Sequence, residues 1–421
     1  MLKSLPRIAL ILVAFAALIL ALPAFRKDRD MRPIRVGILH STSGTMAISE
    51  TPVRDATLMA IEELNARGGV LGRQLVPVVV DGKSDWDVFA AESERLITKE
   101  NVAVVFGCWT SASRKTVRPV YEKYDHLLFY PVQYEGVEES PNIVYTGAAP
   151  NQQIIPAVSW AIDRLKAKRF FLVGSDYVFP RTANAIIRDF VVALGGEIVG
   201  EEYIPLGSTN VTAAVDAIAA AKPDVILNTI NGDSNVPFFK GLRAAGVTSA
   251  KSPTISFSIA EPELLSLDAQ SLAGDYAAWN YFMAVESDAN RQFVTSYKAR
   301  FGKDKVVSDP LEAAYFGVKL WAKAVEEAGN PSPKAVLAAI GDLSYEAPGG
   351  LVYIDPETQH TWKTVRIGRI RADAQFEIVW TSDRPVRPVP FPRTRQHEEW
   401  NQFLTALQAG WAGRWAAPAG G

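Results

Sequence analysis

The chain has 421 residues, of which 48% are hydrophobic and 21% charged, so it is long enough for two or three globular domains. Its 44 basic and 46 acidic residues give a formal charge of −2, which argues against nucleic-acid binding because that requires an excess of cations. Cys108 is the single cysteine and the four histidines are scattered, so neither an internal disulfide nor a zinc site is expected, and no cofactor is predicted.

Residues 1–31 resemble an export signal. Lys3 and Arg7 precede an apolar run at 8–22, which is the order of basic and apolar regions in a secretory signal peptide. An uncleaved N-terminal anchor is the alternative, since the 18 residues of 8–25 are just enough to span a membrane. Either way, the sequence predicts a periplasmic protein that is exported and, under the second alternative, tethered.

The body of the chain alternates short apolar runs with stretches of helical period. In the first part we expect strands at 35–39, 74–80, 102–106 and 127–130, and helices at 54–67, 87–99 and 111–124. Pro77 marks the second of these strands as an edge strand or a bulge. This alternation predicts a parallel sheet with helices on both faces, and therefore an α/β fold.

The pattern then begins again. We expect helices at 151–165, 181–194, 213–221 and 236–245, and strands at 169–173, 197–204 and 225–228. Each half contains a helix followed by Gly-Gly and a strand, at Gly68-Gly69 and at Gly195-Gly196. Two similar halves suggest two similar lobes that face each other.

The last third differs from both halves. Helices are expected at 290–301, 311–328 and 334–340, followed by strands at 351–354, 365–370 and 376–380. After Arg384 the chain is rich in Pro and Arg, and then in Trp, Ala and Gly. We expect this tail to wrap the surface or to be partly disordered.

Signatures of catalysis are absent from the sequence. Gly82-Lys83-Ser84 imitates the end of a phosphate-binding loop, but Pro77 stands where the first glycine is required. Neither a GxSxG elbow nor an HExxH pair occurs. The sequence therefore argues for a protein that is not an enzyme.

Polar and aromatic side chains instead follow most of the predicted strands. Ligands of open α/β sheets bind just beyond the carboxyl ends of the strands. The clusters lie at 40–46, 108–113, 130–134, 175–179, 231–234, 259–261 and 279–281. Because they occur in both halves, the two faces could form one cleft between the lobes.

These clusters carry a family resemblance. The stretches VGILHSTSGTMAISE, VFGCWTSASRK, LLFYPVQYEG, YTGAAPNQQ, FLVGSDYVFPRTAN, NGDSNV and AAWNYF resemble the substrate-binding proteins of urea-type ABC transporters, within the type I periplasmic binding fold. The resemblance covers about residues 34–392 and extends to the amide-binding regulators of bacterial amidase operons. It implies two Rossmann-like α/β lobes joined by three crossovers. On this basis we predict lobe 1 from 32–147 and 281–346, lobe 2 from 148–280 and 347–392, and a tail at 393–421.

The resemblance also implies a small, flat, neutral ligand with many N–H groups. Asp233 and Glu261 could accept hydrogen bonds from those groups. Ser111 and Tyr177 could donate to the ligand's oxygen. The remaining candidates are three aromatic walls, a pocket amide and a residue that orients the ligand: Trp109, Tyr130, Tyr281, Gln133 and Thr45. Amino-acid binders of this fold use a Ser/Thr-rich loop for the carboxylate, and the bulky Trp109 in that loop argues for a smaller ligand.

Each of these residues has an alternative structural explanation. Ser111, Thr45 and Asp233 could be helix caps. Glu261 could be an acid of a helix's first turn. Trp109 and Tyr130 could be core rings, Tyr177 an interdomain packing residue and Gln133 a solvated loop residue. Cys108 is expected to be a small buried packing residue, and Arg114 and Lys115 a solvated helix face.

The function implied by the resemblance is the capture of urea between the lobes and its delivery to the permease subunits of an ABC transporter. The alternatives are an importer of short-chain amides, such as formamide or acetamide, and an amide-sensing regulator. The export signal speaks against the regulator, which would work in the cytoplasm.

Overall fold

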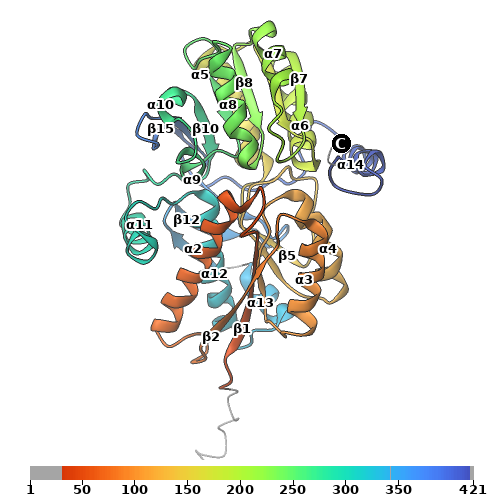
Figure 1. Cartoon of the computed structure of the whole chain (residues 1–421). Coiled ribbons are helices and arrows are strands. Elements are labelled where there is room, and N and C mark those ends of the chain that lie inside the picture. The colour runs from red at the N-terminus through yellow and green to blue at the C-terminus, as the bar shows by residue number, and fades with distance from the viewer. Residues whose placement is uncertain (1–30, 342, 418–421) are drawn as a thin grey trace, which may run out of the picture.

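A computed structural model describes residues 31–341 and 343–417, and in it the chain divides into two lobes stacked one above the other (Figure 1). The predicted leader at 1–31 lies, apart from Met31, outside these residues. Among the helices that are described, none is both long and apolar enough to cross a membrane.

The first lobe is built on a five-stranded sheet whose paired strands are all parallel, in the order β2-β1-β3-β4-β5. Its strands are β1 (Ile34–His40), β2 (Leu75–Asp81), β3 (Val105–Gly107), β4 (Leu128–Tyr130) and β5 (Ile143–Tyr145). β2 is an edge strand, as Pro77 predicts, because a proline has no backbone N–H to donate to a second neighbouring strand.

Helices cover both faces of this sheet. The helix pair α2 (Ala47–Ala66) and α12 (Asp309–Ala328) packs together, as does the pair α3 (Trp86–Thr98) and α4 (Ser111–Lys123) (Figure 1). Two further helices, α11 (Asp288–Phe301) and α13 (Pro333–Ile340), complete the lobe. A small antiparallel sheet joins them: β11 (Ser344–Ala347), β12 (Gly350–Ile354) and β13 (Thr361–Trp362).

The second lobe is built on a seven-stranded sheet in the order β15-β14-β10-β9-β8-β6-β7. Five strands pair in parallel: β6 (Arg169–Ser175), β7 (Glu197–Ile204), β8 (Val225–Thr229), β9 (Thr254–Ser256) and β10 (Tyr276–Trp279). The last two, β14 (Arg366–Ile370) and β15 (Phe376–Thr381), pair antiparallel at one edge. An antiparallel edge on a parallel sheet is common in such folds.

Helices of the second lobe pack on this sheet through two apolar clusters. One cluster includes residues of α5 (Ile154–Leu165) and α6 (Val178–Ala193). The other includes residues of α7 (Thr212–Ala221) and α8 (Asn235–Ala244). Short helices finish the loops: α9 (Glu261–Leu264), α10 (Ala269–Leu272), and the 3-10 turns η2 (Pro150–Gln152) and η3 (Gly232–Ser234).

The chain passes between the lobes in three places. It leaves the first sheet after β5, returns to the first lobe after β10, and goes back to the second sheet between β13 and β14. The two-lobed α/β fold expected from the sequence is therefore confirmed.

The hairpin β11-β12 departs from the predicted division of the chain. That division assigns residues from 347 onward to the second lobe, but Ala347, Val352 and Ile354 are buried in the apolar cluster of the first lobe. In β12 only Val352 and Ile354 are buried, two residues apart and therefore on one face of the strand, and this face joins the core of the first lobe.

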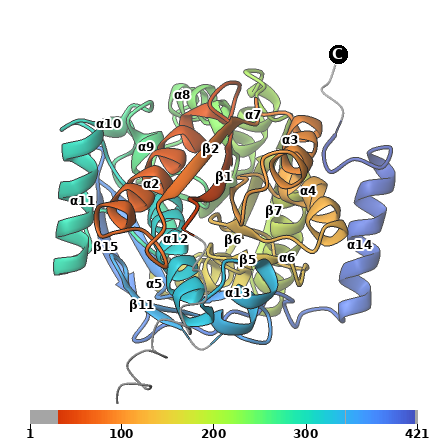
Figure 2. The same cartoon turned by 90° about the horizontal axis from the view of Figure 1, so that it is seen from below.

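The C-terminal tail contains a helix that was not expected from the sequence. Residues His397–Gly410 form the regular helix α14, which lies outside α4 and α6 in Figure 2. Trp400 and Leu404, one helical turn apart, join the cluster that contains α6. This helix was missed because its apolar positions are few and its flanks are rich in Pro, Gly and Trp.

Candidate functional site

The facing ends of the two lobes touch through direct hydrogen bonds. Gln133 Nε2 donates to the carbonyl oxygen of Phe257 at 2.8 Å, and Ser49 Oγ donates to Glu263 Oε1 at 2.6 Å. The Thr45 hydroxyl donates to the Asp233 carboxylate. The loops after β1 and β4 are thus brought against the loops of the second sheet, where parallel-sheet folds bind ligands.

Ser111 is the first residue of α4 and does not cap it. Thr110 is the N-cap, and its side chain accepts from the N–H of Ser113 at 3.0 Å. The Ser111 hydroxyl is therefore free to bond to groups other than the backbone of α4. It donates to Glu135 and accepts from a guanidinium nitrogen of Arg114 at 3.1 Å.

Arg114 and Lys115 overturn the expectation of a solvated helix face. Both are buried, and they pair with two buried carboxylates. Arg114 lies 2.7 Å from Glu138 and 3.3 Å from Glu135, and Lys115 lies 2.7 Å from Glu138. The two buried cations match the two buried carboxylates in charge, and the partly exposed Arg118 lies 3.7 Å from Glu138.

Aromatic rings surround that charge network. The Arg114 guanidinium carbon lies 4.7 Å from the ring centre of Tyr130 and 4.3 Å from that of Tyr134. Tyr130 donates its hydroxyl to the carbonyl oxygen of Trp109 at 2.5 Å. Burial raises the pKa of Tyr177 well above its usual range, and the nearby Tyr130 raises it further, so its hydroxyl stays protonated as a donor.

Two glutamine amides lie at the junction of the lobes. Gln153 Nε2 donates to the carbonyl oxygens of Ala278 at 2.7 Å and of Phe257 at 3.2 Å, and the latter oxygen also accepts from Gln133. The Oε1 atoms of Gln133 and Gln153 are buried, and neither has a hydrogen-bond partner among residues 31–341 and 343–417. Buried acceptors are nearly always paired, so these two oxygens are candidates to accept hydrogen bonds from a bound ligand or an ordered water.

Sequence reasoning included Gln133 among the candidates but missed Gln153. Gln153 lies in the first turn of the helix expected at 151–165, in the stretch YTGAAPNQQ, and nothing local marks it as a ligand residue. The stretch itself belongs to the family resemblance and was the only signal available.

The remaining candidates are engaged in different ways. Trp109 Nε1 lies 3.5 Å from Asn231 Oδ1 in the other lobe. Tyr281 donates to Asn290 at 2.5 Å and packs on Phe293 within the first lobe. Tyr281 therefore serves the core, whereas Trp109 lies where the lobes meet.

Glu261 is fully buried at the start of α9. Its Oε1 accepts from the N–H of Met283 at 2.6 Å, and its Oε2 has no partner in the described chain. Burial raises the pKa of Glu261 to about 8, and the neighbouring Glu263 and Asp309 raise it further against the effect of the backbone hydrogen bonds. Near neutral pH this group is thus largely a neutral carboxylic acid, which can donate as well as accept.

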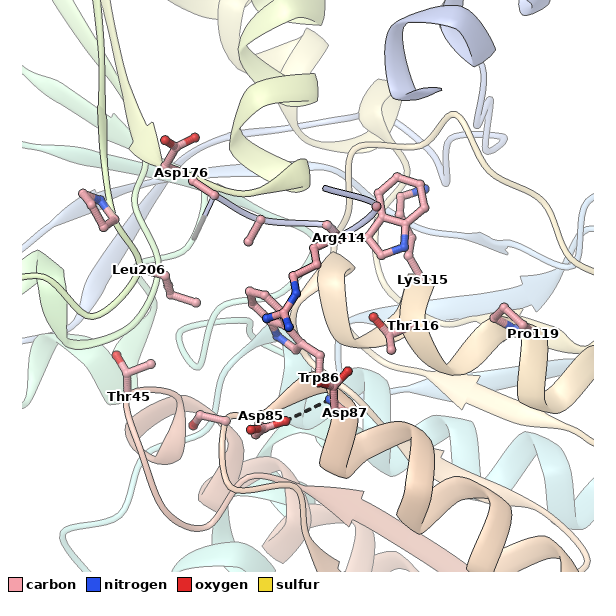
Figure 3. Close-up of a pocket in the computed structure, with 16 residues that line it drawn as sticks. Thr45, Asp85, Trp86, Asp87, Lys115, Thr116, Pro119, Asp176, Leu206 and Arg414 are labelled. Carbon is pink, nitrogen blue, oxygen red and sulfur yellow. Dashed lines mark hydrogen bonds between the residues drawn. The ribbon is translucent and has the colours of Figure 1, made fainter. Parts of the chain in front are cut away.

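A cavity of about 510 Å³ opens at the edge of the site (Figure 3). Lobe 1 contributes Asp85, Trp86 and Lys115 to its wall, and lobe 2 contributes Asp176 and Leu206. It opens between the lobes, and among the predicted ligand residues only Thr45 lines it, so we take this cavity as the mouth of the proposed site.

Comparisons with known proteins agree with this architecture. The sequence profile of the periplasmic binding protein domain matches residues 34–397. A Leu/Ile/Val-binding protein homolog 7 of Brucella suis is 34% identical over 334 residues, covering 75% of this chain and 82% of that protein. Homolog 6 of Brucella melitensis is 23% identical, over 80% of this chain and 87% of that protein.

A shorter match has a different name. A stretch of 118 residues is 32% identical to a protein named limonene hydroxylase from Geobacillus stearothermophilus. That stretch covers 28% of this chain and only 22% of that protein.

Solved structures share the fold at low sequence identity. A solute-binding protein of an ABC transporter from Rhodopseudomonas palustris, in complex with 4-hydroxybenzoate, superposes with a TM-score of 0.76 at 24% identity, over 84% of this chain and 98% of that one. The branched-chain amino acid transporter protein LivJ of Streptococcus pneumoniae, in complex with isoleucine, gives 0.72 at 21% identity, over 85% of this chain and 100% of that one.

Proposed function

We propose that this chain, which belongs to the periplasmic binding protein family, captures urea or a short-chain amide between its lobes and delivers it to the permease of an ABC importer. Its family consists of binding components of transport systems rather than enzymes. The similar proteins bind, by their names, branched-chain amino acids or a hydroxybenzoate. The ligand of this chain therefore has to be argued from its own residues.

The observation that carries the proposal is the pair of unpaired amide oxygens, Gln133 Oε1 and Gln153 Oε1. Buried acceptors favour a ligand that brings N–H donors, because leaving them unpaired costs about 1–3 kcal/mol each. Urea has four N–H bonds and one carbonyl oxygen. A primary amide has two N–H bonds and one carbonyl oxygen. Ser111 and Tyr177 are suited to donate to that oxygen.

Charge balance supports a neutral ligand. A carboxylate, such as that of an amino acid or a benzoate, needs an unpaired cation or several backbone N–H donors once it is buried. Beside Ser111 the buried cations Arg114 and Lys115 are already matched by Glu135 and Glu138. A ligand carboxylate would be the third anion at this wall and would lack a buried counter-charge, because the remaining cation, Arg118, is 35% exposed and already lies 3.7 Å from Glu138.

The test is calorimetric titration of the full chain after unfolding in guanidinium chloride and refolding, which removes any bound ligand. The ligands are urea, acetamide, formamide, leucine and 4-hydroxybenzoate. We expect urea or one of the amides to bind and both carboxylates to fail. Binding of leucine or 4-hydroxybenzoate alone would refute the neutral-ligand proposal while leaving the family unchanged.

Gln133→Met tests the carrying observation. It removes one acceptor while keeping the length of the side chain, so we expect affinity to fall by about 10- to 100-fold. The control is Gln270→Met, which alters an exposed glutamine on α10. Equal affinity in Gln133→Met and the unaltered chain would contradict the assignment of Gln133.

A further inference from the structure

The C-terminal helix α14 is fixed to the second lobe. Arg395 makes a two-pronged ion pair with Asp189 of α6, at 2.8 and 2.9 Å. Trp400 is fully buried, and its indole N–H donates to the carbonyl oxygen of Pro392 at 2.9 Å. A helix anchored in this way gives the chain that follows it a fixed starting point.

After α14 the chain turns back to the mouth of the site. The N–H of Val178 donates to the carbonyl oxygen of Trp415 at 2.9 Å, and the N–H of Ala417 donates to that of Asp176 at 3.1 Å. These two bonds lie on either side of Tyr177, which forms a bridge with Ala416. Ala416 is itself buried against the cluster that contains Tyr177.

The same segment reaches the first lobe through its side chains. The Lys115 ammonium of α4 lies 5.2 Å from the centre of the Trp415 ring. Arg414 extends into the cavity toward Trp86, next to Asp85 and Asp87 (Figure 3). The segment thus bonds to one lobe by its backbone and faces the other with an indole and a cation.

We propose that residues 413–417 form a strap across the mouth of the cleft, which holds Tyr177 in place and slows release of the ligand. The backbone of the strap stays with lobe 2 when the lobes open. Opening therefore separates Trp415 from Lys115, and Arg414 from Asp85 and Asp87. The contacts with lobe 1 therefore stabilise the closed arrangement of the lobes. The part of this proposal that concerns ligand release rests on the proposed function.

The first experiment compares the full chain with a variant truncated after Ala412, which keeps α14. Urea dissociation and association are measured by stopped-flow fluorescence. We expect dissociation to accelerate about tenfold, as for the loss of one or two hydrogen bonds and a cation–π contact, while association changes little. Trp415→Ala keeps the backbone hydrogen bonds and tests the contact with lobe 1 alone. For this variant we expect dissociation to accelerate about threefold.

The control variant is Gln402→Ala on the exposed face of α14, which should leave both rates unchanged. Unchanged dissociation in both the truncated chain and Trp415→Ala would overturn the strap. A fall in association alone would also overturn it, because that would indicate a general loss of structure rather than faster escape.

A second readout needs no ligand. Dyes on Lys99→Cys in lobe 1 and Asp216→Cys in lobe 2 report the separation of the lobes by single-molecule energy transfer, and the native Cys108 is fully buried. We expect truncation to shift the population toward larger separation. If the full chain binds neither urea nor an amide, the proposed function fails and this readout alone decides the strap, which an identical distribution would refute.

Discussion

Two pairs of buried carboxylates, one in each lobe, lie on opposite sides of the cleft. The two pairs differ in the groups that stabilise them. In the first lobe Glu135 and Glu138 lie against two cations. In the second lobe Glu261 and Glu263 open the short helix α9 and are held mainly by backbone N–H groups and by the hydroxyl of Ser49. All four are buried.

The pKa values separate the two pairs. Burial alone would raise the pKa of Glu138, but Arg114, Lys115 and Arg118 bring it well below its usual range. Burial raises the pKa of Glu261 to about 8 and that of Glu263 to about 7, because its effect outweighs that of the hydrogen bonds to these groups. The carboxylates of the first lobe are therefore held in ion pairs and form an ionic wall. Those of the second lobe have pKa values near 7 to 8, so their charge can change within the physiological pH range.

Arg114→Met gives the largest expected effect, because it removes the centre of the ionic wall. Glu135 and Glu138 would keep only Lys115 and the partly exposed Arg118 as cationic partners. Breaking a buried ion pair from one side costs about 3–5 kcal/mol, so we expect the free energy of unfolding to fall by that amount. Denaturation should use guanidinium chloride, since urea is a candidate ligand.

Arg118→Met is the matched control for this loss. Its guanidinium lies 3.7 Å from Glu138, and its side chain is 35% exposed. Solvent screens such a pair, so we expect a loss below about 1 kcal/mol. A loss from Arg114→Met no larger than that from Arg118→Met would show that the ionic wall does not stabilise the first lobe.

Glu261→Gln gives an intermediate effect, which appears as a change in pH dependence. A carboxyl group whose pKa rises from 4.5 to about 8 on folding stabilises the fold fully below pH 4.5. That contribution is lost as the pH rises toward 8, so it makes the unaltered chain less stable with increasing pH. A tenfold change in an acid dissociation constant corresponds to about 1.4 kcal/mol, so a difference of several kcal/mol between chain and variant should build up from about pH 5 to about pH 9.

The measurement is the guanidinium chloride midpoint at several pH values, for the unaltered chain and for Glu261→Gln. Glu286→Gln replaces an exposed glutamate and is the control, which should follow the unaltered chain. Parallel pH profiles for the unaltered chain and Glu261→Gln would mean that Glu261 is ionised in the folded protein, like Glu138 across the cleft.

The ionic wall also shows where sequence reasoning stops. The alternation of apolar runs with helical periods is local, so it predicted the main strands and helices of both lobes. The pairing of Arg114 with Glu138 joins positions 24 residues apart, and nothing local distinguishes it from a solvated helix face. Burial of a charge depends on the packing of several elements, which no window of the sequence contains.

Short elements were missed for a related reason. β5 and β13 have three and two residues, too few to display a period, and α14 lies in a tail of unusual composition. The polar clusters at strand ends were predictable because parallel strands place their carboxyl ends on one edge. The unpaired oxygen of Gln153 was not, since it depends on how the start of α5 packs against the ends of β9 and β10.

Ser49→Ala gives the smallest expected effect and tests how α9 is held. The Ser49 hydroxyl is the contact from lobe 1 that lowers the pKa of Glu263 against its burial. Its removal should cost about 1 kcal/mol in guanidinium chloride denaturation at about pH 8, where Glu263 is largely ionised, and less at about pH 5, where it is protonated. Ser266→Ala, at an exposed position after α9, should change neither value. A loss from Ser49→Ala that is equal at both pH values would mean that the charge on Glu263 does not strengthen this bond between the lobes, and the two walls would then differ less than their pKa values indicate.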